Sequence, residues 1–309
     1  MSRRIEIVDV GPRDGLQNEA VALSAEVRLE FISRLEAAGV RRLEAVSFVN
    51  PSRVPQMAGA EEIMSALPHA SGHSRIGLVL NLRGWERLKG TSCDEANVVV
   101  CATDSFGLRN QNADTAQQIA AMAQVAEDQS ANGGPPLSLT ISVAFGCPFE
   151  GEVPLERVVS IAREAAALNI PEIAMADTIG AADPWDMRRR VEAVRAAAPR
   201  ARLRLHFHDT RNTGLANAAA GIEAGVDVLD ASCGGIGGCP FAPKATGNIA
   251  TEDLAHMLER GGFQTSLDLE ALIETGRWIN ARLGRAPTSA LSRAGRFPKA
   301  RAEAAGAAA

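Results

Sequence analysis

Short apolar runs recur along the chain, and stretches with helical periodicity separate them. Eight of these runs are predicted to be strands: Ile5–Val10, Arg42–Ser47, Ile76–Leu80, Asn97–Ala102, Leu137–Ala144, Glu172–Ala176, Leu203–His208 and Val226–Ala231. Strands that alternate with helices pair in parallel. Eight such units favour a closed barrel over an open sheet. The pattern therefore predicts an α/β fold, specifically a (β/α)8 TIM barrel.

Amphipathic stretches fill the intervals between the predicted strands. The clearest are Ala25–Ala38, Ala113–Ser130, Leu155–Leu168, Pro184–Ala198 and Thr213–Ala224. Two of them end in Gly39 and Gly225, the residue type that most often closes a helix. The third crossover, Asn81–Lys89, has the shortest predicted helix. Because the chain continues with extra C-terminal helices, we predict one catalytic domain over residues 1–300. The alanine-rich residues 301–309 have few anchors and are expected to be a disordered tail.

Composition supports a large core and excludes several classes of protein. Apolar residues make up 46% of the 309 residues, aromatics only 4%, and tyrosine is absent, so Ala, Val, Leu and Ile must fill the core. The formal charge is −5 and no Lys/Arg block occurs, which argues against nucleic-acid binding. No apolar run approaches the roughly 18 residues that span a membrane. A strand at Ile5 leaves no room for a signal peptide, and five scattered cysteines indicate free thiols, so we expect a cytoplasmic protein.

Polar residues gather where the predicted strands end. In a (β/α)8 barrel, the carboxyl ends of the strands and the loops after them carry the chemistry. The residues that fall there are Arg13, Asp14, Glu44, Asn81, Cys147, Asp177, His206, His208, Cys239 and Asn248. Chance would scatter such residues over both ends. We therefore predict an active site at this rim.

His206 and His208 are candidate metal ligands. They are two residues apart on a predicted strand, so both imidazoles point to the same face. The alternative is a pair of hydrogen-bonded core histidines. Asp14 would supply an anionic oxygen and Asn248 a neutral one, and such a mixed shell suits Mg or Mn better than structural zinc. Asp209 is interpreted as a helix cap or an outer neighbour of the site.

The second candidate feature is the glycine-rich segment Gly234–Pro240. Four glycines in five residues predict a mobile loop, and mobile loops at barrel mouths can close over a substrate. Cys239 would be carried on this lid, unless it is a small buried thiol in a tight turn. No Lys-Ser/Thr follows the glycines, so a nucleotide P-loop is not indicated.

Several segments resemble those of the hydroxymethylglutaryl-CoA lyase family. They are Val10–Glu19, Glu44–Pro51 with Val54–Met57, Gly146–Gly151, Asp177–Gly180, His206–Thr210, Gly234–Pro243 and Gly247–Leu254. They extend from residue 10 to residue 254, nearly the whole predicted barrel. Isopropylmalate synthases and hydroxy-oxoacid aldolases of the same superfamily share the Arg-Asp-Gly and His-x-His elements but generally lack the glycine-rich loop. The resemblance therefore favours the lyase branch.

The resemblance implies a role for each candidate residue. The reaction is a metal-dependent retro-Claisen cleavage of a 3-hydroxyacyl-CoA, with hydroxymethylglutaryl-CoA giving acetyl-CoA and acetoacetate, as in leucine degradation. The implied metal ligands are Asp14, His206, His208 and Asn248. Arg13 would stabilise the thioester enolate, Asp14 or His206 would act as base and Cys239 as acid, and Glu44 and Asp177 would orient Arg13 and metal-bound water. The implied substrate contacts are Arg13, Gln17, Ser47, Asn81 and Cys147. We also expect a homo-oligomer.

Departures from the family pattern leave the substrate open. Animal enzymes of the family carry Lys where this chain has Ala20, Thr-Pro-Asn where it has 79–81, and often Ser where it has Ala174. The block after His208 continues as 211–213 Arg-Asn-Thr rather than Tyr-Gly-Gln. Citramalyl-CoA is therefore an alternative substrate, and a hydroxy-oxoacid aldolase or a non-catalytic metal-binding scaffold are alternative functions. No residues remain for the regulatory domain of an isopropylmalate synthase.

Overall fold

Eight parallel strands close into a barrel, which confirms the predicted fold class. The computed structural model describes residues 3–68, 72–238 and 247–297. Around the barrel the strands follow the order β1-β10-β9-β8-β5-β4-β3-β2. They are β1 (Glu6–Asp9), β2 (Arg42–Ser47), β3 (Ser74–Val79), β4 (Glu95–Cys101), β5 (Leu137–Ser142), β8 (Glu172–Asp177), β9 (Arg202–Phe207) and β10 (Val228–Ala231). Each predicted strand is present, with its ends shifted by at most two residues.

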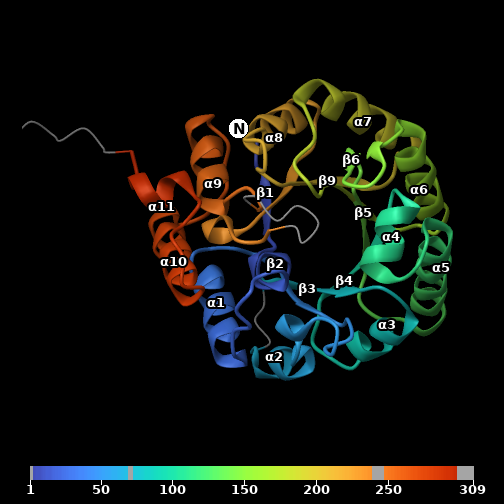
Figure 1. Ribbon diagram of the computed structural model, residues 1–309, viewed down its shortest axis with the longest axis horizontal. Helices are drawn as coiled ribbons and strands as arrows, with labels where there is room; N and C mark the ends of the chain where they lie inside the picture. Colours follow the sequence, from blue (N-terminus) through green and yellow to red (C-terminus); the bar gives the residue numbers. More distant parts are fainter. Residues whose placement is uncertain (1–2, 69–71, 239–246, 298–309) are drawn as a thin grey trace, which may run out of the picture.

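Helices surround the strands as a ring (Figure 1). The crossover helices are α1 (Ala25–Ala37), α2 (Ala60–Ala66), α3 (Leu82–Lys89), α4 (Asp104–Gln111), α5 (Thr115–Asn132), α6 (Leu155–Ala167), α7 (Pro184–Ala197) and α8 (Gly214–Glu223). After β10 come α9 (Thr251–Arg260), α10 (Leu269–Arg282) and α11 (Ala290–Ala294), which confirm the extra C-terminal helices. The hydrophobic pattern does not predict α2, α4 or a small hairpin of β6 (Gly146–Cys147) and β7 (Gly151–Glu152).

Local sequence signals set the helix ends. Asp114 caps α5 by accepting from the backbone of Gln117, whose side chain bonds back to Asp114 in a capping box. Gly39 and Gly225 follow α1 and α8 with φ of 92° and 89°, the left-handed conformation in which glycine has no Cβ penalty. None of the helices in the described ranges is both long and apolar enough to cross a membrane.

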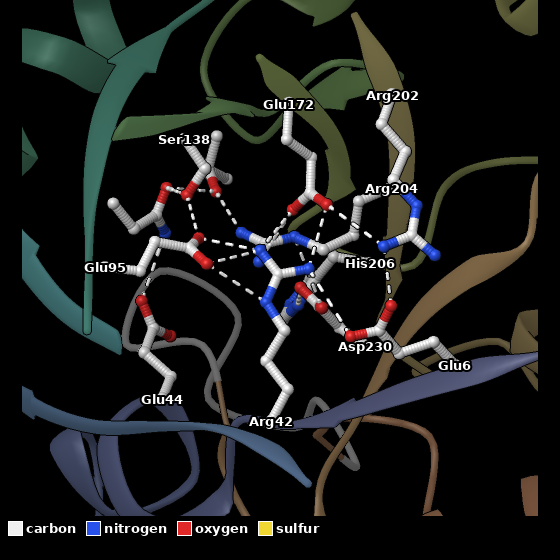
Figure 2. Close-up of polar contacts among 12 residues, drawn as sticks. Glu6, Arg42, Glu44, Glu95, Ser138, Glu172, Arg202, Arg204, His206 and Asp230 are labelled. Atoms are coloured by element: carbon white, nitrogen blue, oxygen red, sulfur yellow. Dashed lines mark hydrogen bonds and ion pairs between the residues drawn. The ribbon is translucent and has the colours of Figure 1, made fainter. Parts of the chain in front are cut away.

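The apolar core and the barrel interior differ in chemistry. The large apolar cluster, which includes fully buried Phe31 and Trp85, packs the helices onto the strands. A smaller cluster contains only Val8, Val10, Ile76 and Val228. Charged residues occupy much of the remaining interior near the amino ends of the strands. We call this network the floor: Glu6, Arg42, Glu95, Ser138, Glu172, Arg202 and Arg204 (Figure 2). The expectation that unusual polar residues would gather at one rim was therefore incomplete, because a second set lies at the opposite end.

Candidate active site

Arg13 and Asp14 lie on one turn of π-helix, Gly11–Gly15, that follows β1. Two glycines permit this turn to approach its neighbours closely. A Cβ on Gly11 would lie 2.8 Å from Oδ1 of Asp9, and a Cβ on Gly15 would lie 2.7 Å from the Ile236 side chain. The turn thereby places adjacent positive and negative side chains at the carboxyl end of the barrel.

Glu44 fixes the direction of Arg13. Nε of Arg13 donates to Oε2 of Glu44 at 2.7 Å, and Nη1 donates to Oδ1 of Asp14 at 2.8 Å. The other Glu44 oxygen accepts from Nδ2 of Asn97 at 3.1 Å, and Oδ1 of Asn97 accepts from Thr140 at 3.1 Å. The predicted contact of Glu44 with Arg13 is present. Glu44 thus connects Arg13 to a chain of polar side chains inside β2, β4 and β5.

Asp14, His206 and His208 form a cluster with the composition of a divalent-metal site. One ligand atom from each residue lies within 4.8 Å of the others. Oδ2 of Asp14 is 3.9 Å from Nε2 of His206 and 3.8 Å from Nε2 of His208, too far for hydrogen bonds. The two imidazole rings lie on the same face, with centroids 5.2 Å apart. Asn248 adjoins the cluster, since its Nδ2 donates to Asp14 Oδ2 at 2.8 Å.

The charges in the cluster stabilise one another. Burial opposes the ionised form of Asp14, but Arg13 and the two imidazoles outweigh burial and hold the pKa of Asp14 well below its usual range. Burial opposes charge on Arg13 as well, yet Glu44 and Asp14 raise the pKa of Arg13. Burial lowers the pKa of His206, and hydrogen bonding to Asp230 together with the Asp14 charge outweighs burial and raises the pKa. The site therefore holds Asp14 as an anion at neutral pH.

A pocket of about 680 Å³ opens onto this cluster. Arg13, Asp14, His206 and His208 line its inner part. Apolar side chains form part of its wall, among them Phe48, Leu78, Leu80, Val99 and Phe106. Arg53 and Arg83 also line it and are exposed to solvent, so the pocket is basic toward its mouth.

The predicted substrate contacts divide into two groups. Gln17 and Asn81 line the pocket, and within 3–68, 72–238 and 247–297 the buried Oε1 of Gln17 has no hydrogen-bond partner. Ser47 and Cys147 are buried and do not line it. Cys147 instead accepts from the hydroxyl of Thr103 at 3.1 Å.

Asp177 does not line the pocket either. Its Oδ1 accepts from the backbone N–H of Ala181 at 2.7 Å, and its Oδ2 accepts from Ala182 at 3.0 Å. Both carboxylate oxygens therefore hold the loop after β8. These contacts give Asp177 a role in holding that loop, and its predicted role in orienting metal-bound water stays a prediction.

The glycine-rich segment is packed rather than open over its first part. Gly234, Gly235 and Gly237 are buried and have φ of 77°, 63° and 103°. A Cβ on Gly234 would lie 2.5 Å from Asn280, and one on Gly235 would lie 2.4 Å from Thr288. These glycines allow a left-handed backbone and close contacts over 234–237, so packing explains them without motion, and a mobile loop stays a prediction. Cys239 and the rest of the predicted lid, 239–246, lie outside the described residues.

Three residues at the site were missed from the sequence. Asp230 contacts His206 and lines the pocket, and Asn97 and Thr140 line it as well. A signal was available, because Asp230 is the single charged residue in the short strand β10. Asn97 is likewise a polar residue in a strand whose residues are all buried. Only the closed barrel shows that they face the same cavity.

Comparison with known proteins identifies relatives over nearly the whole chain. The HMGL-like family model matches residues 4–279. An (R)-citramalyl-CoA lyase from Chloroflexus aurantiacus is 41% identical over 302 residues, covering 94% of this chain and 95% of the relative. A hydroxymethylglutaryl-CoA lyase from Pseudomonas mevalonii is 39% identical, with coverage of 94% and 95%. A solved HMG-CoA lyase from Acinetobacter baumannii, in complex with coenzyme A and 3-methylmalate, has a TM-score of 0.90 at 37% identity and covers 95% of both chains.

Proposed function

The chain belongs to the HMGL-like family of carbon–carbon lyases, and from that premise we propose that it is a divalent-metal-dependent lyase for a 3-hydroxyacyl-CoA. The convergence of Asp14, His206 and His208 beside Arg13 carries this proposal. It joins a candidate cation site to a fixed positive side chain in one pocket. A retro-Claisen cleavage needs both, because charge develops first on the hydroxyl oxygen and then on the thioester oxygen.

The donor set fits Mg or Mn. Oδ1 of Asn248 and Nδ1 of His208 are buried and have no hydrogen-bond partner among the residues that the structure describes. Asp14, His206, His208 and Asn248 would hold the ion, a combination of oxygen and imidazole ligands without thiolate. When bound, the ion would supply positive charge that lowers the pKa of a substrate hydroxyl.

Arg13 would act at the thioester oxygen. Its guanidinium is held by Glu44 and Asp14 before substrate arrives, so it can donate toward the pocket without reorganising. Asp14 and His206 both face the pocket and are the two candidates for the base that takes the hydroxyl proton. Of these roles, the orientation of Arg13 by Glu44 has the most direct support in the contacts.

For the proton that reaches the enolate carbon we propose Cys239, as the family resemblance implies. It lies outside the described residues. The other four cysteines, Cys93, Cys101, Cys147 and Cys233, are buried, and none lines the pocket. Burial raises the pKa of Cys93 to about 11 and that of Cys101 to about 12, so these thiols are weak acids as well as remote.

Two substrates are candidates, and both are thioesters. Hydroxymethylglutaryl-CoA is favoured by the names of several relatives at 35–39% identity, and citramalyl-CoA by the relative at 41%. The exposed Arg53 and Arg83 suit the phosphates of a CoA group. A role in leucine degradation, a cytoplasmic location and a homo-oligomeric state stay predictions of the sequence.

Incubation with a panel of 3-hydroxyacyl-CoAs and either Mg or Mn tests the function. Mass spectrometry should detect acetyl-CoA with acetoacetate from hydroxymethylglutaryl-CoA, or acetyl-CoA with pyruvate from citramalyl-CoA. Cleavage of free hydroxy-oxoacids without any CoA product would identify an aldolase instead. No cleavage of any thioester by metal-loaded protein would refute the proposal.

A further inference from the structure

Asp230 contacts the side of His206 that faces away from the cluster. Oδ2 of Asp230 is 3.2 Å from Nδ1 of His206, while Nε2 of His206 points toward Asp14. Asp230 is 3% exposed and still borders the pocket. Each ring nitrogen of His206 thus faces a different carboxylate, one in β10 and one on the turn after β1.

Arg204 connects Asp230 to the floor. It precedes His206 by two residues on β9, so both side chains point into the barrel. Nε of Arg204 is 3.5 Å from Oδ1 of Asp230, and Nη1 is 3.3 Å from Oε1 of Glu172. Figure 2 draws Arg204, Glu172, Asp230 and His206 together with the contacts among them. A continuous polar path therefore runs from Glu172 at the floor to His206 at the rim.

We propose that Asp230, which forms an ion pair with Arg204, is a positioning residue that keeps the proton of His206 on Nδ1 and leaves Nε2 free as a ligand. A neutral imidazole carries one proton, and a buried carboxylate at Nδ1 attracts it. The choice of tautomer then decides whether the nitrogen that faces Asp14 carries a lone pair or a hydrogen. The inference rests on the proposed metal centre for its consequence, although the tautomer itself is a property of the metal-free chain.

The contacts favour this role over simple charge balance for Arg204. If Asp230 served only Arg204, both of its oxygens would face the guanidinium. Instead Oδ2 lies nearer to His206 than Oδ1 lies to Arg204, at 3.2 Å against 3.5 Å. Arg204 also has a second carboxylate in Glu172. Asp230 therefore shares its charge between the floor and the rim.

Nitrogen-15 NMR of the metal-free protein tests the tautomer directly. The chain has five histidines, so His206→Gln identifies its signals by difference. At a pH where the ring is neutral, the native chain should show His206 with a protonated Nδ1 and an unprotonated Nε2. Asp230→Leu, which is close in volume, should give a mixture of tautomers. An unchanged tautomer in folded Asp230→Leu would overturn the inference.

Affinity for Mn²⁺, measured by electron paramagnetic resonance, tests the consequence. Loss of an outer partner of a metal-bound histidine typically costs about 10–100-fold in affinity. We expect a loss of that size in Asp230→Leu and a smaller one in Asp230→Asn, whose amide oxygen can still accept from Nδ1. Asp230→Asn also preserves the shape of the site if the leucine variant does not fold. Arg204→Met should fall between Asp230→Asn and the native protein.

Arg202→Met is the matched control. Arg202 lies on the same strand and pairs with Glu6, but it contacts neither Asp230 nor His206, and its side chain is 43% exposed. Its Mn²⁺ affinity should equal that of the native protein. Equal affinities in all the variants would overturn the role of Asp230. If the native chain itself bound no Mn²⁺, the metal proposal would fail, while the NMR experiment would still decide the tautomer.

Discussion

Arg13 and Arg42 are both buried arginines that pair with glutamates inside the same barrel, at 9% and 8% exposure. Arg42 donates to Glu95 and Glu172 through five hydrogen bonds of 2.6–3.1 Å and does not line the pocket. Arg13 donates to Glu44 and Asp14 and does line it. The two arginines carry the same charge and differ in whether they reach the pocket.

This difference shows what distinguishes a reactive charge from a structural one. At the floor the carboxylates of Glu95 and Glu172 are occupied by arginines and by Ser138. Among the described residues, buried atoms without a hydrogen-bond partner occur at both ends: Nε and Nη1 of Arg204 at the floor, and Nδ1 of His208 and Oδ1 of Asn248 at the rim. His208 lines the pocket, whereas Arg204 does not. A buried charge therefore indicates chemistry only where its neighbours also line a cavity that a ligand can enter.

Removal of divalent metal should have the largest effect. EDTA should abolish lyase activity, and Mg or Mn should restore it, because the bound ion would stabilise negative charge on the substrate hydroxyl oxygen. His206→Ala should lose Mn²⁺ binding. His256→Ala, on α9 and away from the pocket, should retain it. Full activity after chelation would mean that Asp14 and the two histidines bind no catalytic metal and, like the charged residues of the floor, have a structural role.

Arg42→Met should cost about 3–5 kcal/mol of unfolding free energy, because it leaves Glu95 and Glu172 buried with less compensation. Urea denaturation measures this loss. Turnover per folded molecule should stay close to that of the native protein, since Arg42 does not line the pocket. If turnover fell strongly although all of the variant was folded, Arg42 would contribute to activity as Arg13 does, and the distinction between the two arginines would not hold.

Arg13→Gln should reduce turnover by about 10²–10³-fold, since loss of one preorganised donor at a developing oxyanion has that effect. Steady-state kinetics should show the fall in kcat with little change in KM. Arg13→Lys should rescue poorly, because an ammonium cannot donate to Glu44, Asp14 and substrate in the same plane. A raised KM at native kcat would instead assign Arg13 to binding of the CoA group.

Arg83→Ala should have the smallest effect. An exposed charge at the pocket mouth contributes about 1 kcal/mol, so KM for the thioester should rise roughly fivefold while kcat is unchanged. The rise should shrink at high salt. Arg163→Ala is the control, because Arg163 is exposed on α6 and pairs with Glu156 far from the pocket. Equal kinetics in both variants would show that the mouth does not bind the phosphates.

Local patterns predicted the strands well. The strand Arg42–Ser47 and the helix starts at Ala25, Leu155 and Pro184 agree with the structure to the residue. Alternation of side chains and capping residues act within a few positions, so a single sequence contains them. The convergence of Arg13 with Asp14, His206 and His208 could also be predicted from the sequence, because the carboxyl ends of parallel strands meet at one end of a barrel.

The remaining features depended on contacts between distant segments. Arg202, Arg204 and His206 alternate along β9, which places them on one face, but which carboxylate each meets depends on how eight strands close. A glycine run does not reveal whether its glycines permit motion or close contact. Gly234 and Gly235 have the second role because Asn280 and Thr288, far along the chain, occupy the space a side chain would need.

The contact of Gly234 with Asn280 and Thr288 makes the C-terminal segment necessary for the loop after β10. The carbonyl of Gly234 accepts from Nδ2 of Asn280 at 3.0 Å and from the hydroxyl of Thr288 at 3.3 Å, so α10 and the segment after it hold the loop that follows β10. A chain cut after β10 would lose both contacts. The smallest fragment that keeps this loop in place is therefore larger than the barrel and reaches at least to Thr288.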